Sequence, residues 1–499
     1  MKEATQVWIV GRQEKEDEED VDWPAGEQDR ASQEAARGSA RAPYHVSVQG
    51  WNQNYTSIFL KGLCSTNVTK MTIEADRIEG ELPDFGRCFP FLESFEITMK
   101  YKQPLELGKL LSSASRLYSL KTTGVDFELP VVAPKYIDSI EFLHIEHSDL
   151  SELPKWMATA GKLCSLVVKH TRLSSVSTVT QMKSLRSLRL SHNRLDDIHR
   201  HAFSNPDLHD LDLSHNQILY LASFIFSHCL NLRVLDLSHN PIKELPFRPF
   251  LKNSRMKWLK LSHTGITTLT ADHFMGLVSL KTLTVTHTPL QSIANFAFLP
   301  LKNLRSLDLQ ACNLTRIPVA VTHNCALTHL NLADNLLHRS SSLPPEVLAL
   351  LSSLSQFRIE GNPLTEFSPA LLLLSTDNAR LYRQMLVSPW NQDKMIKEGL
   401  THCREQYDWM SEQMTIYRDL ERSSGCSVSR RLRSSIERSN VLQCPNTTVA
   451  PPSPAILPRP VRVSPNLLLI ISLASNVVFV FLIVVIICLI WSSGRRGKY

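Results

Sequence analysis

A short pattern of leucines recurs along this chain with a fixed period, and it limits the possible folds more than any other feature. From Leu185 the sequence reads Leu-Arg-Ser-Leu-Arg-Leu-Ser-His-Asn-Arg-Leu. The same frame restarts in steps of 23 or 24 residues at Leu208, Leu232, Met256, Leu280, Leu304 and Leu327. Six weaker copies bring the count to thirteen units over residues 68–380, and they start at Val68, Leu92, Leu117, Ile140, Leu163 and Leu354. Such a period is the signature of a solenoid of stacked repeats.

Each unit predicts one short strand whose alternate residues point into a shared core. In the unit at Leu208 these inward residues are Leu208, Leu211 and Leu213. One unit cannot bury them alone, whereas stacked units form a continuous core. We therefore predict an α/β fold: a leucine-rich repeat solenoid, or horseshoe, with parallel β-strands on its concave face, followed by one C-terminal transmembrane helix.

Two further columns of residues follow the same period. The ninth position suits a buried amide that satisfies backbone groups at the turn, and in five units it holds Asn193, Asn216, Asn240, Asn335 and Asn362. Thr264, Thr288 and Cys312 replace this asparagine in the units between. A column of aromatic side chains, which we expect to pack beneath the convex side, consists of Phe203, Phe226, Phe250, Phe274 and Phe298.

Composition and motifs argue against chemistry. The net charge of +6 over 499 residues is mild, and the one basic cluster, at 430–433, has no interleaved aromatic residues that could stack on bases. The chain has no P-loop, no zinc-spaced cysteine cluster and no nucleophile elbow. We therefore predict no enzyme activity, no cofactor, no metal and no nucleic-acid partner.

The cysteines suggest a capped, oxidised solenoid. Cys64 and Cys88 are one repeat step apart, so stacking would bring them side by side at the first unit, and they are the disulfide candidate. Disulfides of this kind persist in oxidising compartments. Cys403, Cys426 and Cys444 lie past the last repeat, and the sequence does not determine how these three pair.

A membrane segment follows the repeats. Residues 467–491 contain no charge, and a helix of this length exceeds the hydrocarbon core of roughly 30 Å, so the lipid bilayer is a predicted partner. Arg495, Arg496 and Lys498 follow at once, which favours a cytoplasmic tail at 492–499. Asn476 inside the segment could bond to another helix, which suggests a homo- or hetero-dimer.

The remaining segments complete the predicted domain organisation. Residues 1–43 are a disordered polar segment and 44–67 an N-terminal cap, while 381–444 form a helical C-terminal cap and juxtamembrane region. Seven prolines make 445–465 a stiff stalk.

The orientation in the membrane has two readings. Residues 1–43 contain no apolar run like that of a signal peptide, so the chain as written would be tail-anchored, with a cytosolic repeat scaffold on an organelle membrane. Four glycosylation sequons favour the reverse, a single-pass type I protein of the plasma membrane with extracellular repeats and a natural N-terminus that differs from this one. Their acceptors are Asn54, Asn67, Asn313 and Asn446.

The repeat frame, the phenylalanine column, the cysteine cap, the stalk and the single apolar helix together resemble the ectodomains of Toll-like receptors. The resemblance covers residues 64–491 and is specific to the architecture. It departs at the end, where only eight residues follow the apolar helix. What it implies is recognition without autonomous signalling, as a receptor, co-receptor, adhesion protein or decoy.

We predict that the outward strand positions of the units from Leu185 to Leu332 form the ligand face. Acidic groups there adjoin an exposed tryptophan, a mixture suited to a protein ligand or co-receptor with basic residues. Solvated charge without a partner is the alternative. The candidates are Arg189, Asp210, Asp212, Asp236, Trp258, Lys260, Asp308 and Asn331.

The eighth position holds histidine in seven consecutive units: His147, His170, His192, His215, His239, His263 and His287. Because adjacent strands lie roughly 4.8 Å apart, the imidazoles should form a ladder along one rim of the sheet. Either the ladder is merely the usual composition of this turn, or it is a switch. As a switch, its like charges would repel below a pH of about 6.5, and acid would loosen the solenoid or attract an anionic ligand. One straight row offers few ligands to any metal ion.

Overall fold

The computed structural model describes residues 6–11, 44–50, 64, 67–78, 82–127, 135–351 and 353–365. The chain divides into two units, Met1–Cys444 and Pro445–Tyr499, and every described residue lies in the first. The predicted C-terminal cap, stalk, membrane helix at 467–491 and tail lie outside the described residues. Within the described ranges, no helix has the length and apolar character needed to cross a bilayer.

One sheet of fifteen strands runs through the described part of the first unit. From β2 onward the neighbours are parallel, and each of the thirteen predicted frames contributes one strand, from β3 to β17. The bounds of the first seven are β2 Tyr44–Gln49, β3 Val68–Ala75, β4 Ser94–Leu105, β5 Ser119–Phe127, β6 Phe142–Glu146, β7 Ser165–Lys169 and β8 Ser187–Arg189. The others are β9 Asp210–Asp212, β10 Val234–Asp236, β11 Trp258–Lys260, β13 Thr282–Thr284, β15 Ser306–Asp308, β16 His329–Asn331 and β17 Gln356–Arg358.

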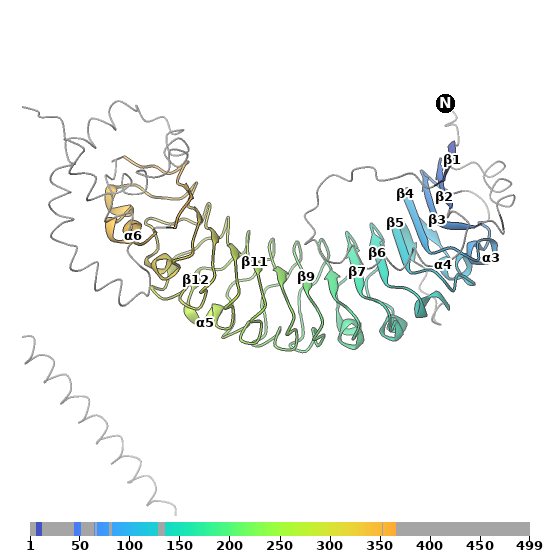
Figure 1. Cartoon of the computed structure of the whole chain (residues 1–499), viewed down its shortest axis with the longest axis horizontal. Coiled ribbons are helices and arrows are strands. Elements are labelled where there is room, and N and C mark those ends of the chain that lie inside the picture. The colour runs from blue at the N-terminus through green and yellow to red at the C-terminus, as the bar shows by residue number, and fades with distance from the viewer. Residues whose placement is uncertain are drawn as a thin grey trace, which may run out of the picture. The chain divides into compact units, whose positions relative to one another are not determined.

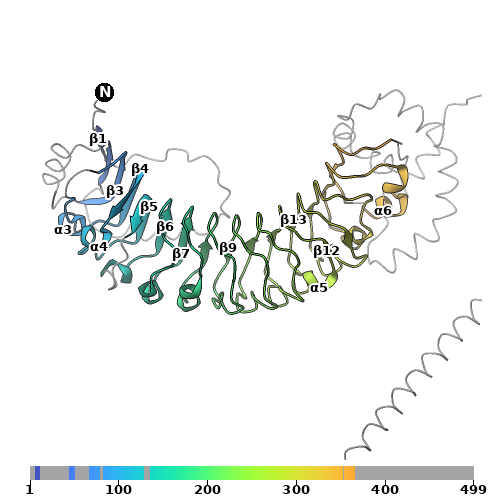
Figure 2. The same ribbon diagram turned by 180° about the vertical axis from the view of Figure 1, so that it is seen from behind.

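The strands line the inner side of a curved stack, and short helices and turns lie on its outer side (Figures 1 and 2). The α-helices are α3 Phe85–Cys88, α4 Leu107–Leu110, α5 Ala271–Phe274 and α6 Pro345–Leu350. The described residues also include five 3-10 helices: η1 Lys135–Asp138, η2 Lys155–Thr159, η3 Ser177–Gln181, η4 Val319–His323 and η5 Ser340–Ser342. A second, two-stranded sheet pairs β12 Thr268–Leu269 with β14 Ser292–Ile293. The solenoid therefore has parallel strands on its concave face, as predicted.

One strand departs from the prediction. Residues Gln6–Gly11 form β1, which pairs antiparallel with β2, although the polar segment 1–43 was expected to be disordered throughout. The run from Val7 to Val10 has the β-branched and aromatic composition of a strand, but it lies in a segment whose other residues are mostly polar and charged. Pairing with the exposed edge of the sheet satisfies backbone groups that the first parallel strand would otherwise leave open.

The core consists of the residue columns that the repeat frame predicts. Leu208, Leu211 and Leu213 are buried, and so is each of the five column phenylalanines. The Phe226 ring lies between Phe203 and Phe250, with centroid distances of 6.0 and 5.8 Å. This column sets the spacing of units on the convex side.

The asparagine column satisfies the turns. In the unit at Leu208, the Asn216 amide donates to the carbonyl oxygens of Leu190 at 2.9 Å and Leu213 at 3.0 Å, and its oxygen accepts from the Leu195 N–H at 3.1 Å. Where Cys312 replaces asparagine it is a buried thiol, and burial raises its pKa to about 12.

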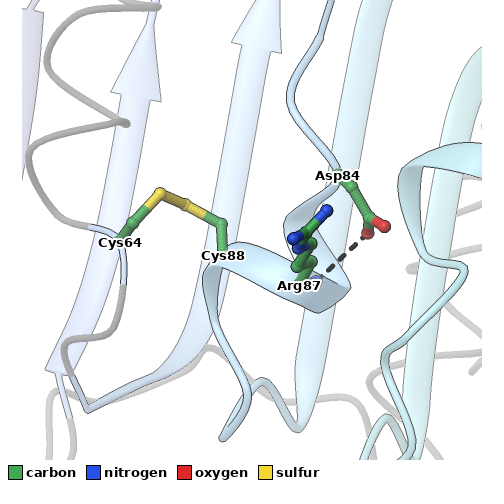
Figure 3. The surroundings of a disulfide bond; sticks show 4 residues. All are labelled: Cys64, Asp84, Arg87 and Cys88. Atoms are coloured by element: carbon green, nitrogen blue, oxygen red, sulfur yellow. Dashed lines mark hydrogen bonds between the residues drawn. A yellow bond between two sulfur atoms is a disulfide. The ribbon is translucent and has the colours of Figure 1, made fainter.

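A disulfide closes the N-terminal end. Cys64 and Cys88 are bonded, with their Cα atoms 4.5 Å apart (Figure 3). Cys88 is the last residue of α3, which begins after Asp84, whose carboxylate accepts a hydrogen bond from the Arg87 N–H at 3.1 Å. The first repeat is thereby tied to the segment that precedes it.

Candidate ligand-binding face

The three-residue strands present two columns of side chains on the concave face. In β8, β9 and β10 the middle leucine is buried, while the first and third residues are partly exposed. Parallel pairing without a register shift aligns these positions from Arg189 through Asp212, Asp236 and Lys260. Of the predicted candidates, Asp210 and Trp258 lie in the first-residue column, and Arg189, Asp212, Asp236, Lys260, Asp308 and Asn331 lie in the third.

Three of the predicted acidic residues bond to their own turns. Asp212 accepts hydrogen bonds from the N–H of Ser214 at 3.0 Å and from its hydroxyl at 2.7 Å. Asp236 and Asp308 repeat this contact with the N–H two residues later, at 3.0 and 3.1 Å. The second oxygen of Asp236 lies 3.2 Å from the Lys260 ammonium nitrogen. These carboxylates therefore have fewer free acceptor positions for a basic partner than the sequence suggests, because the N–H groups of the turns already occupy some of them.

Asn331 corrects one prediction. It was expected to point outward, but it is buried, with 9% of its surface exposed. Its oxygen accepts from the Ala333 N–H at 3.0 Å, and its amide donates to the Gln310 side chain at 3.3 Å. The Asn331 side chain bonds to the N–H of its own turn, as the aspartates do. Its second hydrogen bond is to the Gln310 side chain.

Aromatic side chains are exposed at three places on the described strands, and one of them is Tyr101 in β4, which is 50% exposed. Trp258 is 36% exposed, and the Lys257 ammonium lies 5.7 Å from its ring centroid. Phe142, the first residue of β6, is 44% exposed and meets Tyr118 edge to face at 6.3 Å. The Phe142–Tyr118 pair lies outside the units from Leu185 to Leu332, to which the predicted ligand face is confined.

A column of basic residues, which is not among the predicted ligand-face candidates, lies beside the strands. The residue immediately before the strand, at the second position of the frame, is basic in six consecutive units, and each of these side chains is exposed or half-exposed. The members are Arg186, His209, Arg233, Lys257, Lys281 and Arg305. The alignment that reveals the histidine column also reveals this one. Because strand residues separate the two columns, the basic residues and the histidines occupy opposite edges of the sheet.

The predicted histidine rings stack into a continuous ladder. Consecutive ring centroids from His147 to His287 are 3.9 to 4.6 Å apart. Each of the seven residues has a left-handed backbone, with φ between 51° and 58°. Desolvation, and then the neighbouring imidazoles, lower the pKa values of His239 and His263, while the Asp236 carboxylate acts in the opposite direction on His239.

The lowered pKa values predict a pH-dependent stability. The unfolded chain takes up these protons near the ordinary pKa of about 6.5, before the ladder does. The contribution of the neutral ladder histidines to the stability of the fold is therefore fully present above that pH. It is lost as the pH falls toward their lower pKa in the folded state. We expect the midpoint temperature of thermal unfolding of the parent to be a few degrees lower at about pH 5.5 than at about pH 7.4. Replacing His192, His239 and His263 by glutamine should reduce this shift, and an equal shift in both proteins would contradict a switch.

The sequons differ in what the structure describes. Asn313 is exposed, with a φ of 57°, and Asn67 is half-exposed. Asn54 and Asn446 lie outside the described residues. The two described acceptors are therefore at the surface, where a glycan could be attached.

Comparisons with known proteins agree with the repeat fold. The leucine rich repeat family model matches residues 161–218, 183–242, 230–290 and 279–337. Over 110 residues the chain is 32% identical to leucine-rich repeat-containing G-protein coupled receptor 5 of Rattus norvegicus, a stretch that is 21% of this chain and 12% of that receptor. The chain thus spans a small part of this relative.

Two solved structures show the same fold. A leucine-rich repeat protein of Leptospira interrogans aligns with a TM-score of 0.52 and 21% identity, over 62% of this chain and 77% of that one. A chain of the Drosophila Toll–Spatzle complex aligns with a TM-score of 0.54 and 19% identity, over 64% of this chain and 44% of that one. Residues 161–337 match the leucine rich repeat family, and the solenoid is similar to the ectodomains of Toll-like receptors and other leucine-rich repeat receptors.

Proposed function

We propose that this chain is a receptor-type binding protein of the plasma membrane, a single-pass type I protein whose extracellular repeats bind a protein ligand or co-receptor on the concave face. Leucine-rich repeat solenoids typically act as binding scaffolds, because the stack presents a long concave surface and no catalytic machinery. The likeness to receptor ectodomains supports the same role.

The observation that carries this proposal is the exposed Trp258 beside the basic column. An exposed aromatic ring with a neighbouring cation is typical of interface anchors. The turns use part of the acceptor capacity of Asp212 and Asp308. The arginines and lysines of the basic column, together with Arg189 and Lys260, also outnumber the acidic strand residues of these units. We therefore propose a partner with an acidic surface, in place of the basic partner that the sequence suggests.

The test compares full-length variants displayed on cells, screened against purified secreted and cell-surface ectodomains. Trp258→Ala combined with Lys257→Glu and Lys281→Glu should weaken a specific partner by more than about 100-fold, since an anchor residue alone costs about 2 kcal/mol or more. Phe247→Ala with Lys252→Glu provides the matched control among exposed residues outside the strands. Unchanged binding by the triple variant would place the site elsewhere.

A third variant distinguishes a partner with an acidic surface from one with a basic surface. Asp212→Lys with Asp236→Lys should leave binding of an acidic partner intact or strengthen it, after allowance for any loss of stability at the turns. If this variant abolishes binding and the basic-column variant does not, the partner is basic, as the sequence alone suggests.

The orientation has its own test. The disulfides at Cys64–Cys88 and at Cys325 favour an oxidising compartment. We expect glycosidase digestion of the expressed protein to lower its apparent mass, and Asn313→Gln to remove part of that shift. An unchanged mass together with reduced cysteines would support the alternative, a tail-anchored cytosolic scaffold on an organelle membrane.

A further inference from the structure

The first two rungs of the histidine ladder differ from the others because a carboxylate lies beside them. The Glu146 Oε1 atom is 3.9 Å from the His147 Nε2 atom and 4.0 Å from the His170 Nε2 atom. One donor atom from each of these three side chains lies within 4.8 Å of the other two. We propose that Glu146, His147 and His170 form a binding site for a transition-metal dication, with Zn²⁺ as the preferred ion.

The sheet holds the three residues in position. Glu146 ends β6, and in the parallel pairing of β6 with β7 it stands opposite Lys169. His147 and His170 follow these two residues in equivalent turns with φ of 54° and 51°, and the His147 N–H donates to the Lys169 carbonyl at 3.2 Å. Paired strands therefore fix the backbone of all three proposed ligands before any ion binds.

A fourth side chain orients the carboxylate. The His144 Nε2 atom lies 3.2 Å from the Glu146 Oε2 atom, so that the other carboxylate oxygen, Oε1, is the one facing His147 and His170. Outer-shell contacts of this kind position metal ligands and tune their affinity. His144 is thus a positioning residue for the proposed site.

The donor set has the chemistry that zinc takes. Two imidazole nitrogens and one carboxylate oxygen occur in zinc sites that keep a fourth position open. The side chains of His147, His170 and Glu146 are 53%, 37% and 24% exposed, so water or a group from a partner can reach that position. The first two rings are stacked at 4.6 Å and nearly parallel, and both are exposed enough to turn toward the carboxylate.

The sequence explains why the site lies at this end of the ladder. The seventh position of the frame, just before each histidine, is glutamate at 146, lysine at 169, and serine or threonine in the five units that follow. Of the seven histidines in the ladder, only His147 is directly preceded by an acidic residue. A row of histidines alone offers few ligands to one ion, which is why no metal is predicted from the histidine column by itself.

Lys169 provides a matched probe of the site. It faces Glu146 across the strand pair, and its charge acts on both His144 and His170. A cation at this point opposes a bound dication. We therefore expect Lys169→Gln to tighten binding, whereas a loss of general surface charge elsewhere would have no such effect.

The experiment is calorimetric titration of the purified full-length protein with zinc chloride. We expect one site, weakened by about 10- to 100-fold in His144→Gln. The loss in Glu146→Gln and in His170→Gln should be larger, because each of these variants removes a proposed ligand. His263→Gln, which removes a ladder rung far from any carboxylate in the seventh position, should bind zinc as the parent does. Circular dichroism of each variant checks that the fold is retained.

Cobalt substitution gives a readout that does not depend on affinity alone. Co²⁺ bound by two imidazoles and a carboxylate should give visible absorption that disappears in His147→Gln/His170→Gln. Equal weakening by His263→Gln would show binding along the whole ladder and would overturn the proposal. So would parent-like titration of Glu146→Gln.

Discussion

Replacing Phe226 by alanine is expected to lower the free energy of unfolding by about 3–5 kcal/mol. The ring is fully buried and lies between Phe203 and Phe250 in the aromatic column. Its removal leaves a cavity between units, and neighbouring repeats in a solenoid depend on each other for burial. Urea unfolding followed by circular dichroism should show a lower midpoint.

Phe247→Ala is the control for this prediction. Phe247 is 54% exposed, and its ring contacts the Arg248 guanidinium at 4.7 Å without entering the core. We expect a change of about 1 kcal/mol or less. Similar losses from both substitutions would mean that the aromatic column does not set the spacing of the units.

Removing the N-terminal disulfide is the second large effect. Cys64→Ser with Cys88→Ser should cost about 2–5 kcal/mol, because the bond restricts the unfolded chain at the exposed end of the stack. In a solenoid the loss is local, so hydrogen exchange should accelerate in β3 and β4 before it does in β10.

Reductant provides the control. Treatment of the parent should reproduce the faster exchange in β3 and β4, while the double variant should show no further change in those strands. If exchange in the first strands is unaltered by either treatment, the disulfide does not stabilise this end.

Much of the fold could be predicted from the sequence because the repeat period is itself a structural parameter. The period places Leu211 under Leu235 and stacks Phe226 on Phe250 without knowledge of any other contact. It also places the rings of His215 and His239 side by side, 3.9 Å apart. The pairing of strand β1 could not be predicted, because β1 is outside the repeat and its edge partner lies more than thirty residues away in sequence.

The candidate site was less predictable, because the period places residues in columns but does not determine what each side chain contacts. Asp212 and Asn331 both stand at outward strand positions, yet each is drawn to the N–H of its own turn. The sequence pattern for this contact is an Asp or Asn at the third strand position, two residues before the N–H that donates to it.

The sequence by itself determined the repeat, the direction of the strands, the buried columns and the two polar columns at the edges of the sheet, because all of these follow from one period. The tertiary structure decided which carboxylate oxygens remain available to a ligand, because the N–H groups of the turns bond to the same carboxylates. It also decided that Glu146 faces two imidazoles, one of them from the next repeat. The contact joins Glu146, at the seventh position of the frame, to His147 and His170, at the eighth. It therefore depends on the side-chain directions that the folded sheet fixes.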